Sequence, residues 1–179
     1  GMSAANAIGT LDPNANTTVL TQEPDMPYFR PMIPFLISGN KQAREISLTG
    51  QGPYQYQGAT IKTNSMVISL NASEQLVVLA NGEELPYDKL LIATGSRPMV
   101  PDQVQQTQVN GQFTLRTIAQ ATAMAKRAET TKKAVLLGGG ILNTKVALAL
   151  QERGIDVTMV ELEEEILPWL MEADAACLI

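Results

Sequence analysis

A glycine-rich stretch between two apolar segments decides the fold of this chain: V-L-L-G-G-G-I-L-N, residues Val135–Asn143. The run Lys133–Leu137 before the glycines has the composition of a strand, and Ile141–Arg153 after them has that of a helix. Gly138 would allow the tight turn between them. Gly140 has no Cβ, so it would let a pyrophosphate approach the backbone. The amide groups at the start of the helix would then face the phosphates.

A second strand and an acidic residue follow this stretch. Gly154 would end the helix, and Asp156–Val160 predicts the strand. Glu161 comes 18 residues after Asn143, close to the spacing of about 20 at which an acid binds ribose hydroxyls. A carboxylate there favours NAD over NADP, because it would repel a 2′-phosphate. The candidate NAD-binding residues are therefore Gly138, Gly140, Ile141 and Glu161.

Two features leave another interpretation open. Asn143 replaces the third glycine of the dinucleotide-binding fingerprint G-x-G-x-x-G. Glu161 also begins the acidic run Glu161–Glu165, apart from Leu162, which is typical of a solvated surface. The alternative is a glycine turn in another kind of α/β protein, with Glu161 in solvent.

The first half of the chain predicts a similar helix–turn–strand order. Ser3–Leu11 predicts a helix, and the β-branched run Thr17–Thr21 predicts a strand. Short alternating runs over about residues 59–86 predict an antiparallel meander. The continuous apolar run Lys89–Ala93 predicts a strand that is buried on both faces. The expected fold class is α/β, with two incomplete dinucleotide-binding (Rossmann-like) units and an antiparallel β-meander.

Weaker signals complete the expected order of elements. They are an extended loop over Pro24–Pro34, a helix over Lys41–Ile46, a linker over Pro98–Pro101 and Gln103–Gln112, and a helix over Thr117–Thr130.

Composition excludes several classes of function. The 179 residues carry a net charge of −5, which disfavours broad attraction to nucleic acid or to anionic membranes. A single cysteine, Cys177, and the absence of histidine exclude an intrachain disulfide, a Ser-His triad and a His-ligated zinc, so we expect no metal site. No apolar segment is long enough to span a bilayer and no signal peptide is recognisable, so we expect a soluble cytoplasmic protein.

Four segments resemble the FAD-dependent pyridine nucleotide–disulfide oxidoreductase superfamily. Tyr87–Pro98 resembles its A-T-G segment, Pro27–Pro31 its flavin-side loop, and Leu115-Arg116 the segment before its NAD unit. Gly138–Ala147 with Val157–Glu161 resembles the NAD unit itself. Within the superfamily the chain looks most like the branch of NADH oxidases, nitrite reductases and coenzyme A-disulfide reductases.

The resemblance implies two cofactors, FAD and NAD(H), and hydride transfer from nicotinamide to flavin, then to an acceptor that the sequence does not name. Residues 1–112 would be a partial FAD-binding domain, and residues 113–179 the first part of an NAD-binding domain. Gly1–Ala5 would begin at the last glycine of the FAD fingerprint. The chain is therefore similar to an internal fragment, a truncated reading frame or one chain of a split flavoprotein, and a complementing chain or a homo-oligomer is its expected macromolecular partner.

The resemblance also places residues at FAD, each with a structural alternative. Glu23, or its neighbour Gln22, would accept the FAD ribose hydroxyls; the alternative is an ordinary loop carboxylate. Arg30 and Pro31 would lie beside the pyrophosphate or the flavin; the alternative for Arg30 is a surface residue that anchors a loop. The other candidates are Val67, Ala93, Thr94 and Gly95, for which a core strand and a tight turn are the alternatives.

A second function, of a different class, stays open: a non-catalytic α/β module that binds a nucleotide or a partner chain. Pro31 stands where disulfide-reducing relatives carry a redox cysteine, so thiol–disulfide chemistry at the flavin is not expected. Asn143 and the missing FAD glycines also favour this alternative. We expect the 179-residue chain to bind FAD weakly or not at all.

Overall fold

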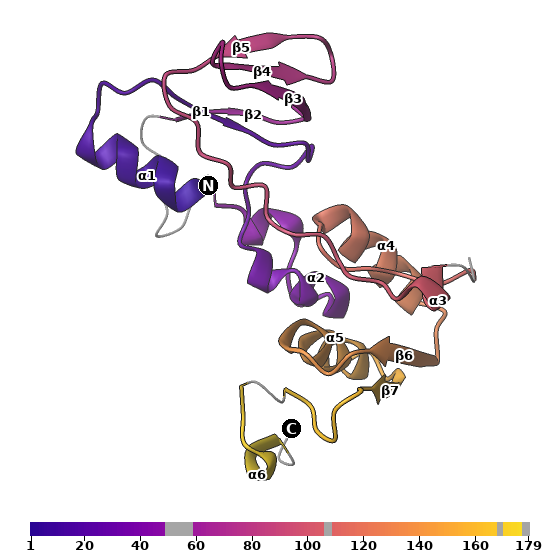
Figure 1. The fold of residues 1–179 in the computed structure, drawn as a ribbon. Coiled ribbons are helices and arrows are strands. Elements are labelled where there is room, and N and C mark those ends of the chain that lie inside the picture. The colour runs from indigo at the N-terminus through magenta and orange to yellow at the C-terminus, as the bar shows by residue number, and fades with distance from the viewer. Residues whose placement is uncertain (49–58, 106–108, 168–169, 177–179) are drawn as a thin grey trace. The chain divides into compact units, whose positions relative to one another are not determined.

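The computed structural model describes residues 1–48, 59–105, 109–167 and 170–176. The chain forms two compact units, each made from two separate stretches (Figure 1). The first unit comprises Gly1–Phe29 and Ser47–Arg97, and the second comprises Arg30–Ile46 and Pro98–Ile179. Residues 30–46 therefore pack with the second half of the chain, although they lie within the first half of the sequence.

A helix and two parallel strands form one part of the first unit. Helix α1 (Met2–Leu11) is followed by strand β1 (Thr17–Leu20), which pairs in parallel with β2 (Ala59–Lys62). The register places Thr17 opposite Ala59. Helix α1 packs on both strands and buries Ala5. The predicted helix–turn–strand order of the first 21 residues is confirmed.

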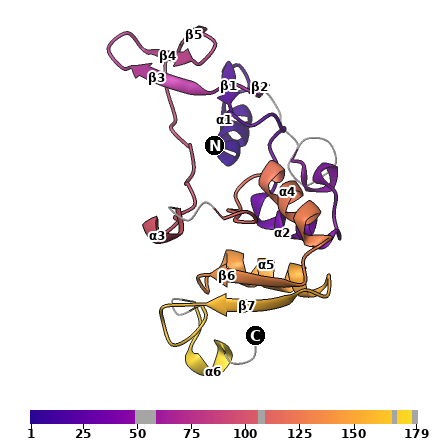
Figure 2. The ribbon, with the colours of Figure 1, turned by 90° about the vertical axis from the view of Figure 1, so that its right-hand side faces the viewer.

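An antiparallel meander forms the other part of the first unit. It contains β3 (Val67–Asn71), β4 (Leu76–Leu79) and β5 (Glu84–Pro86), with β4 in the middle (Figure 2). The prediction that the run from residue 59 belongs to this meander is wrong. The Ser65 amide donates to the Thr21 carbonyl oxygen at 2.8 Å, so the chain after β2 continues beside the chain after β1 instead of folding back.

The prediction of a buried strand at Lys89–Ala93 is also wrong. This segment has no strand assignment, and Leu91 and Ile92 are 62% and 67% exposed. A strand forms only where a neighbouring strand takes up its backbone hydrogen bonds. None of the strands in the described ranges pairs with this segment, and its exposed backbone is open to water.

Short helices and α4 form one side of the second unit. They are η1 (Arg30–Met32), α2 (Pro34–Ser38), η2 (Ala43–Ile46), α3 (Asp102–Gln105) and α4 (Ile118–Ala128). Helix α2 packs against α4 and buries Ile37 completely. The extended loop predicted over Pro24–Pro34 is therefore wrong at its end, because Pro34 occupies the first turn of α2, where its missing N–H costs nothing. Likewise, α3 lies within the predicted linker.

A complete capping box begins α4. The Thr117 hydroxyl accepts from the Gln120 amide at 3.2 Å, and the Gln120 side-chain oxygen accepts from the Thr117 amide at 3.1 Å. These two bonds satisfy amide groups that a helix start leaves without partners. The sequence signal T-x-x-Q explains why the helix begins at Ile118.

The glycine-rich stretch forms the other side of the second unit. Strand β6 (Lys133–Leu137), helix α5 (Ile141–Gln151) and strand β7 (Asp156–Val160) follow one another as predicted. The strands are parallel, with Leu137 opposite Val160, and α5 covers one face of the pair (Figure 2). The opposite face exposes Val135, Leu137 and Val160.

Helix α5 also contacts α2, and Arg153 just after it donates from Nη1 to the Ala125 carbonyl oxygen at 2.7 Å. The last helix in the described ranges is α6 (Ala173–Ala176). None of the helices described by the structure has the length and apolar character needed to cross a membrane. The architecture is therefore α/β, with parallel and antiparallel sheets.

Candidate functional site

The glycine loop joins β6 to the first turn of α5. Gly138 has a φ of +96° and donates its amide to the Val160 carbonyl oxygen at 2.7 Å, so the loop adds one more bond after the last strand pair. Gly140 is the N-cap of α5, and no side chain caps the helix. A Cβ at Gly140 would meet no atom within 4 Å. The start of α5, including the exposed side chain of Ile141, is therefore open to an anionic group.

Glu161 lies against this loop. One carboxylate oxygen, Oε2, accepts from the Gly139 amide, and the other, Oε1, accepts from the Leu162 amide at 2.6 Å. These bonds, with that from Gly139 the strongest, hold the pKa of Glu161 below its ordinary value. Backbone amides thus fix Glu161 at the end of β7, beside the N-terminus of α5, and its lowered pKa favours the ionised form.

Gly139 is a site residue that the sequence interpretation missed. A Cβ there would lie 2.9 Å from Glu161 Oε2 and 3.1 Å from Ile166 Cγ2. The Gly139 carbonyl oxygen also accepts from the Leu167 amide at 3.0 Å. The segment after β7 therefore packs on the middle glycine. The sequence held a signal for this role. The fingerprint G-x-G allows any residue at its middle position, and this chain has a glycine there.

Comparisons with known proteins agree with this geometry. Residues 1–178 match the model of the family described as pyridine nucleotide-disulphide oxidoreductase. The chain belongs to the pyridine nucleotide-disulphide oxidoreductase family.

Several curated proteins are similar along most of this chain. The nitrite reductase (NADH) large subunit of Escherichia coli K12 is 31% identical over 148 residues, which are 83% of this chain and 17% of that protein. The epsilon subunit of the NADH-dependent phenylglyoxylate dehydrogenase of Aromatoleum evansii is 28% identical over 178 residues, which are 99% of this chain and 42% of that protein. The chain thus spans less than half the length of these relatives.

Several solved structures share the fold. A NAD-dependent persulfide reductase from A. fulgidus superposes with a TM-score of 0.88 at 25% identity, over 99% of this chain and 35% of that one. The water-forming NADH oxidase of Lactobacillus brevis, solved with NADH bound, gives a TM-score of 0.80 at 23% identity, over 99% of this chain and 41% of that one. The predicted resemblance to this superfamily is confirmed.

The FAD-side candidates of this family member are divided between the two compact units. Glu23 follows β1, and its carboxylate accepts from the Tyr28 hydroxyl at 2.5 Å. Its backbone carbonyl oxygen accepts from the Asn64 amide at 3.1 Å. Glu23 therefore lies after its strand, as Glu161 lies after β7, but a side-chain hydroxyl rather than a glycine-loop amide holds it.

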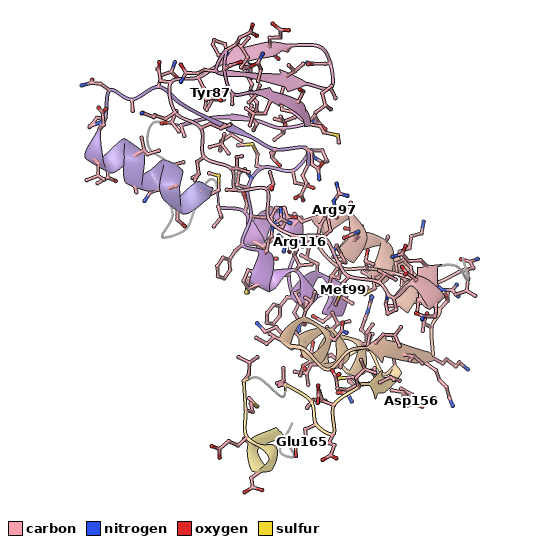
Figure 3. All side chains as sticks on the ribbon, in the orientation of Figure 1. Tyr87, Arg97, Met99, Arg116, Asp156 and Glu165 are labelled. Atoms are coloured by element: carbon pink, nitrogen blue, oxygen red, sulfur yellow. The ribbon has the colours of Figure 1, made fainter. Side chains whose placement is uncertain are left out.

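Arg30 and Pro31 begin the second unit, in η1. Arg30 donates from Nη1 to the carbonyl oxygen of Arg116 at 2.7 Å. Arg116 lies just before α4 (Figure 3). This bond anchors the loop, as the structural alternative for Arg30 expects. Pro31 is exposed. In both residues, the role at FAD stays a prediction.

The remaining FAD candidates lie in the first unit. Val67 begins β3 and is 42% exposed, so it is not the core residue that its structural alternative expects. Ala93, Thr94 and Gly95 are exposed in the segment after β5, and Gly95 has a φ of +75°. Ala93 ends no strand, contrary to expectation. Within the described ranges, no three acidic, cysteine or histidine residues gather in a way that could hold a metal ion.

Proposed function

We propose that this chain is the nucleotide-binding part of an NAD(P)H-dependent flavoprotein oxidoreductase, and that its second unit binds NADH. The observation that carries the proposal is the position of Glu161. Its carboxylate is held at the glycine loop by Gly139, at the end of β7 and beside the uncapped start of α5. The arrangement has the donors, the open space and the acid that a dinucleotide requires.

The pyrophosphate would lie over Gly140 and Ile141, where the helix amides and the positive end of the helix dipole face it. Nothing within 4 Å of a Cβ at Gly140 would obstruct this approach. The ribose hydroxyls would donate to the Glu161 carboxylate. A 2′-phosphate would instead meet a negative charge, and the neighbouring acids Glu163 and Glu164 are exposed.

The first unit would contribute the FAD-side residues Glu23, Val67 and Ala93–Gly95. Arg30 and Pro31 belong to the second unit, and their role at FAD stays a prediction. Bound FAD and NAD(H) would supply the hydride-transfer chemistry, and that transfer would require no acidic or basic side chain of this chain. With no cysteine at Pro31, the chain offers no thiolate there for disulfide exchange. The polypeptide's part is to bind and orient the two nucleotides.

Titration with NADH and NADPH tests the proposal. Charge-assisted hydrogen bonds contribute about 1.5–3 kcal/mol, so we expect at least a roughly tenfold preference for NADH. Glu161→Ala should abolish that preference. Glu164→Ala removes the same charge from an exposed position three residues away and should retain it. Equal affinity for the two nucleotides in the unchanged protein would reject Glu161 as a ribose ligand.

A second candidate function is a non-catalytic module that binds a nucleotide or a partner chain. The exposed apolar side chains of Leu91 and Ile92 favour it, because large exposed apolar residues are common where another chain binds. The ratio of flavin absorbance to protein absorbance after gel filtration separates the two functions. Stoichiometric FAD would support the flavoprotein oxidoreductase and reject the second candidate. A protein that elutes without flavin and does not take up added FAD would favour the second candidate.

A further inference from the structure

Asn143 stands where the dinucleotide-binding fingerprint has its third glycine, and its side chain is bonded to the glycine loop. Asn143 Nδ2 donates to the Leu137 carbonyl oxygen at 2.6 Å and to the Gly138 carbonyl oxygen at 2.9 Å. These carbonyls lie at and just beyond the last strand pair, Leu137 with Val160. The carboxamide thus supplies a donor to both acceptors at the point where the strand ladder stops.

The planarity of the peptide bond converts these two bonds into an orientation of two amides. In a trans peptide, the carbonyl of one residue and the amide of the next point in opposite directions. None of the described peptide bonds is cis. When Asn143 holds the carbonyls of Leu137 and Gly138 on its side, the amides of Gly138 and Gly139 point to the other side.

Both amides find their partners on the segment around the end of β7. The Gly138 amide donates to the Val160 carbonyl oxygen at 2.7 Å, and the Gly139 amide donates to the Glu161 carboxylate. The Asn143 side chain and the Glu161 side chain therefore bind opposite ends of one peptide group, the one that joins Gly138 to Gly139.

We propose that Asn143 is a positioning residue that, through the Gly138–Gly139 peptide, aims the Gly139 amide at Glu161 and so holds the acid that selects NADH. This role deepens the proposed function, and the preference for NADH rests on that function. In place of the close helix–strand packing that a glycine allows, this chain uses a side-chain amide that spans the first turn of α5 and the end of β6. Asn143 touches no nucleotide in this role.

The first test is made without any nucleotide. The titration of the Glu161 carboxyl and the shift of the Gly139 amide are followed by NMR in Asn143→Ala and Asn143→Gly, two uncharged variants. Both should raise the pKa of Glu161 towards its ordinary value and move the Gly139 amide resonance. The glycine variant keeps the test open should the alanine variant fold poorly, because glycine is the fingerprint residue at this position.

Thr144→Val is the matched control. Thr144 is the next residue of α5, is buried, and donates from Oγ1 to the Gly140 carbonyl oxygen at 3.2 Å. The variant removes a bond to the same loop but none that orients the Gly139 amide. Thr144→Val should leave the Glu161 titration unchanged. A general loosening of the loop would instead shift that titration in Thr144→Val as well as in the Asn143 variants.

The second test measures the ratio of NADH to NADPH affinity. Asn143→Ala should lower that ratio roughly tenfold, towards the value of Glu161→Ala, and the double variant should lower it no further, because the two residues act in series. An unchanged Glu161 titration in both Asn143 variants would overturn the inference. A shifted titration in a protein that binds neither nucleotide would support the positioning role and reject the proposed function.

Discussion

Two apolar runs of five residues have nearly the same pattern and different structures. Lys133–Leu137 (K-A-V-L-L) forms β6, which pairs with β7 and packs under α5. Lys89–Ala93 (K-L-L-I-A) is exposed and has no strand assignment. The difference lies in their neighbours, because β6 has a parallel partner 23 residues along the chain, counted from Lys133 to Asp156. An apolar run becomes a strand where another strand accepts its backbone hydrogen bonds.

Proline placed in each run should give the largest contrast. The Gly138 amide donates to Val160 and the Asp156 amide to Lys132, so the even-numbered residues of β6 direct their backbone groups towards β7. Ala134→Pro removes one such amide and should lower the free energy of unfolding of the second unit by about 3 kcal/mol. Ala93→Pro removes an amide outside any described ladder. It should change the free energy of unfolding of the first unit by no more than about 0.5 kcal/mol.

Urea denaturation followed by hydrogen exchange in each unit measures the contrast. If Ala93→Pro destabilises the first unit as strongly as Ala134→Pro destabilises the second, Lys89–Ala93 has a ladder partner after all, and the comparison fails.

Alanine substitutions at two adjacent glycines test whether the loop after β6 is held as firmly as the strand itself. Gly139→Ala places its Cβ 2.9 Å from Glu161 Oε2, so the carboxylate must move. We expect the pKa of Glu161 to rise and the preference for NADH to fall roughly tenfold, about 1.4 kcal/mol. Titration with both nucleotides and NMR of the Glu161 carboxyl check this.

Gly140→Ala is the matched variant. Its Cβ meets nothing within 4 Å, and its φ of −73° is accessible to alanine. It should leave the Glu161 pKa unchanged and weaken NADH and NADPH equally, because the methyl group stands where the phosphates approach. Identical results for the two glycines would mean that Glu161 and the loop are not held together as described.

The sequence predicted well those elements whose partners are close in the chain. The β6–loop–α5–β7 unit was recognised to within two residues at its ends because each element packs on the next. The same reasoning fails at Lys89–Ala93, because whether this segment forms a strand depends on a partner strand that is not adjacent in the sequence. It also failed at Pro34, which proline statistics assign to a loop although it begins α2.

The candidate site divides in the same way. Gly138, Gly140 and Glu161 follow a known spacing and lie at one loop, and their role at NAD stays a prediction. The role of Gly139 depends on Glu161 and Ile166, which are more than 20 residues away and reach it only in the folded chain. Asn143 was recognised solely as a departure from the fingerprint, because spacing carries no information about where a side-chain amide points.

Loss of the α4 cap should have a smaller effect, confined to the second unit. Thr117→Ala removes the hydroxyl that accepts from the Gln120 amide. A lost N-cap costs about 1 kcal/mol, and thermal unfolding with unit-resolved hydrogen exchange measures it. Thr117→Ser keeps the acceptor and should restore the stability. Slower exchange in α4 of the alanine variant would be incompatible with the capping box.

The smallest effect concerns the first unit, at an ion pair between β2 and the turn before β5. Lys62 Nζ lies 2.6 Å from Glu83 Oε1, and both side chains are more than a third exposed. The hydrogen bond from Lys62 holds the pKa of Glu83 below its ordinary value of 4.5. A lowered carboxyl pKa stabilises the fold at pH values above 4.5, and this contribution disappears as the pH falls through the folded pKa.

Lys62→Met should therefore lower the melting temperature slightly at pH 7 and less at pH 2, because protonation of Glu83 removes the charge that Lys62 pairs with. The effect is small because exposed ion pairs are screened by solvent. Melting curves at both pH values check it. A loss of stability that is equal at the two values would assign the effect to packing of the lysine chain and not to its charge.

The segment Lys89–Ala93 also bears on how the protein behaves at high concentration. It is a short apolar stretch with one charge, and none of the strands that the structure describes pairs with its backbone. Stretches of this kind act as templates on which copies of a chain add strands to one another, the first step towards β-rich aggregates. Leu91→Lys would place a gatekeeper charge in its middle. Light scattering of concentrated samples should then fall, which makes this one position the natural place to improve the colloidal stability of the molecule.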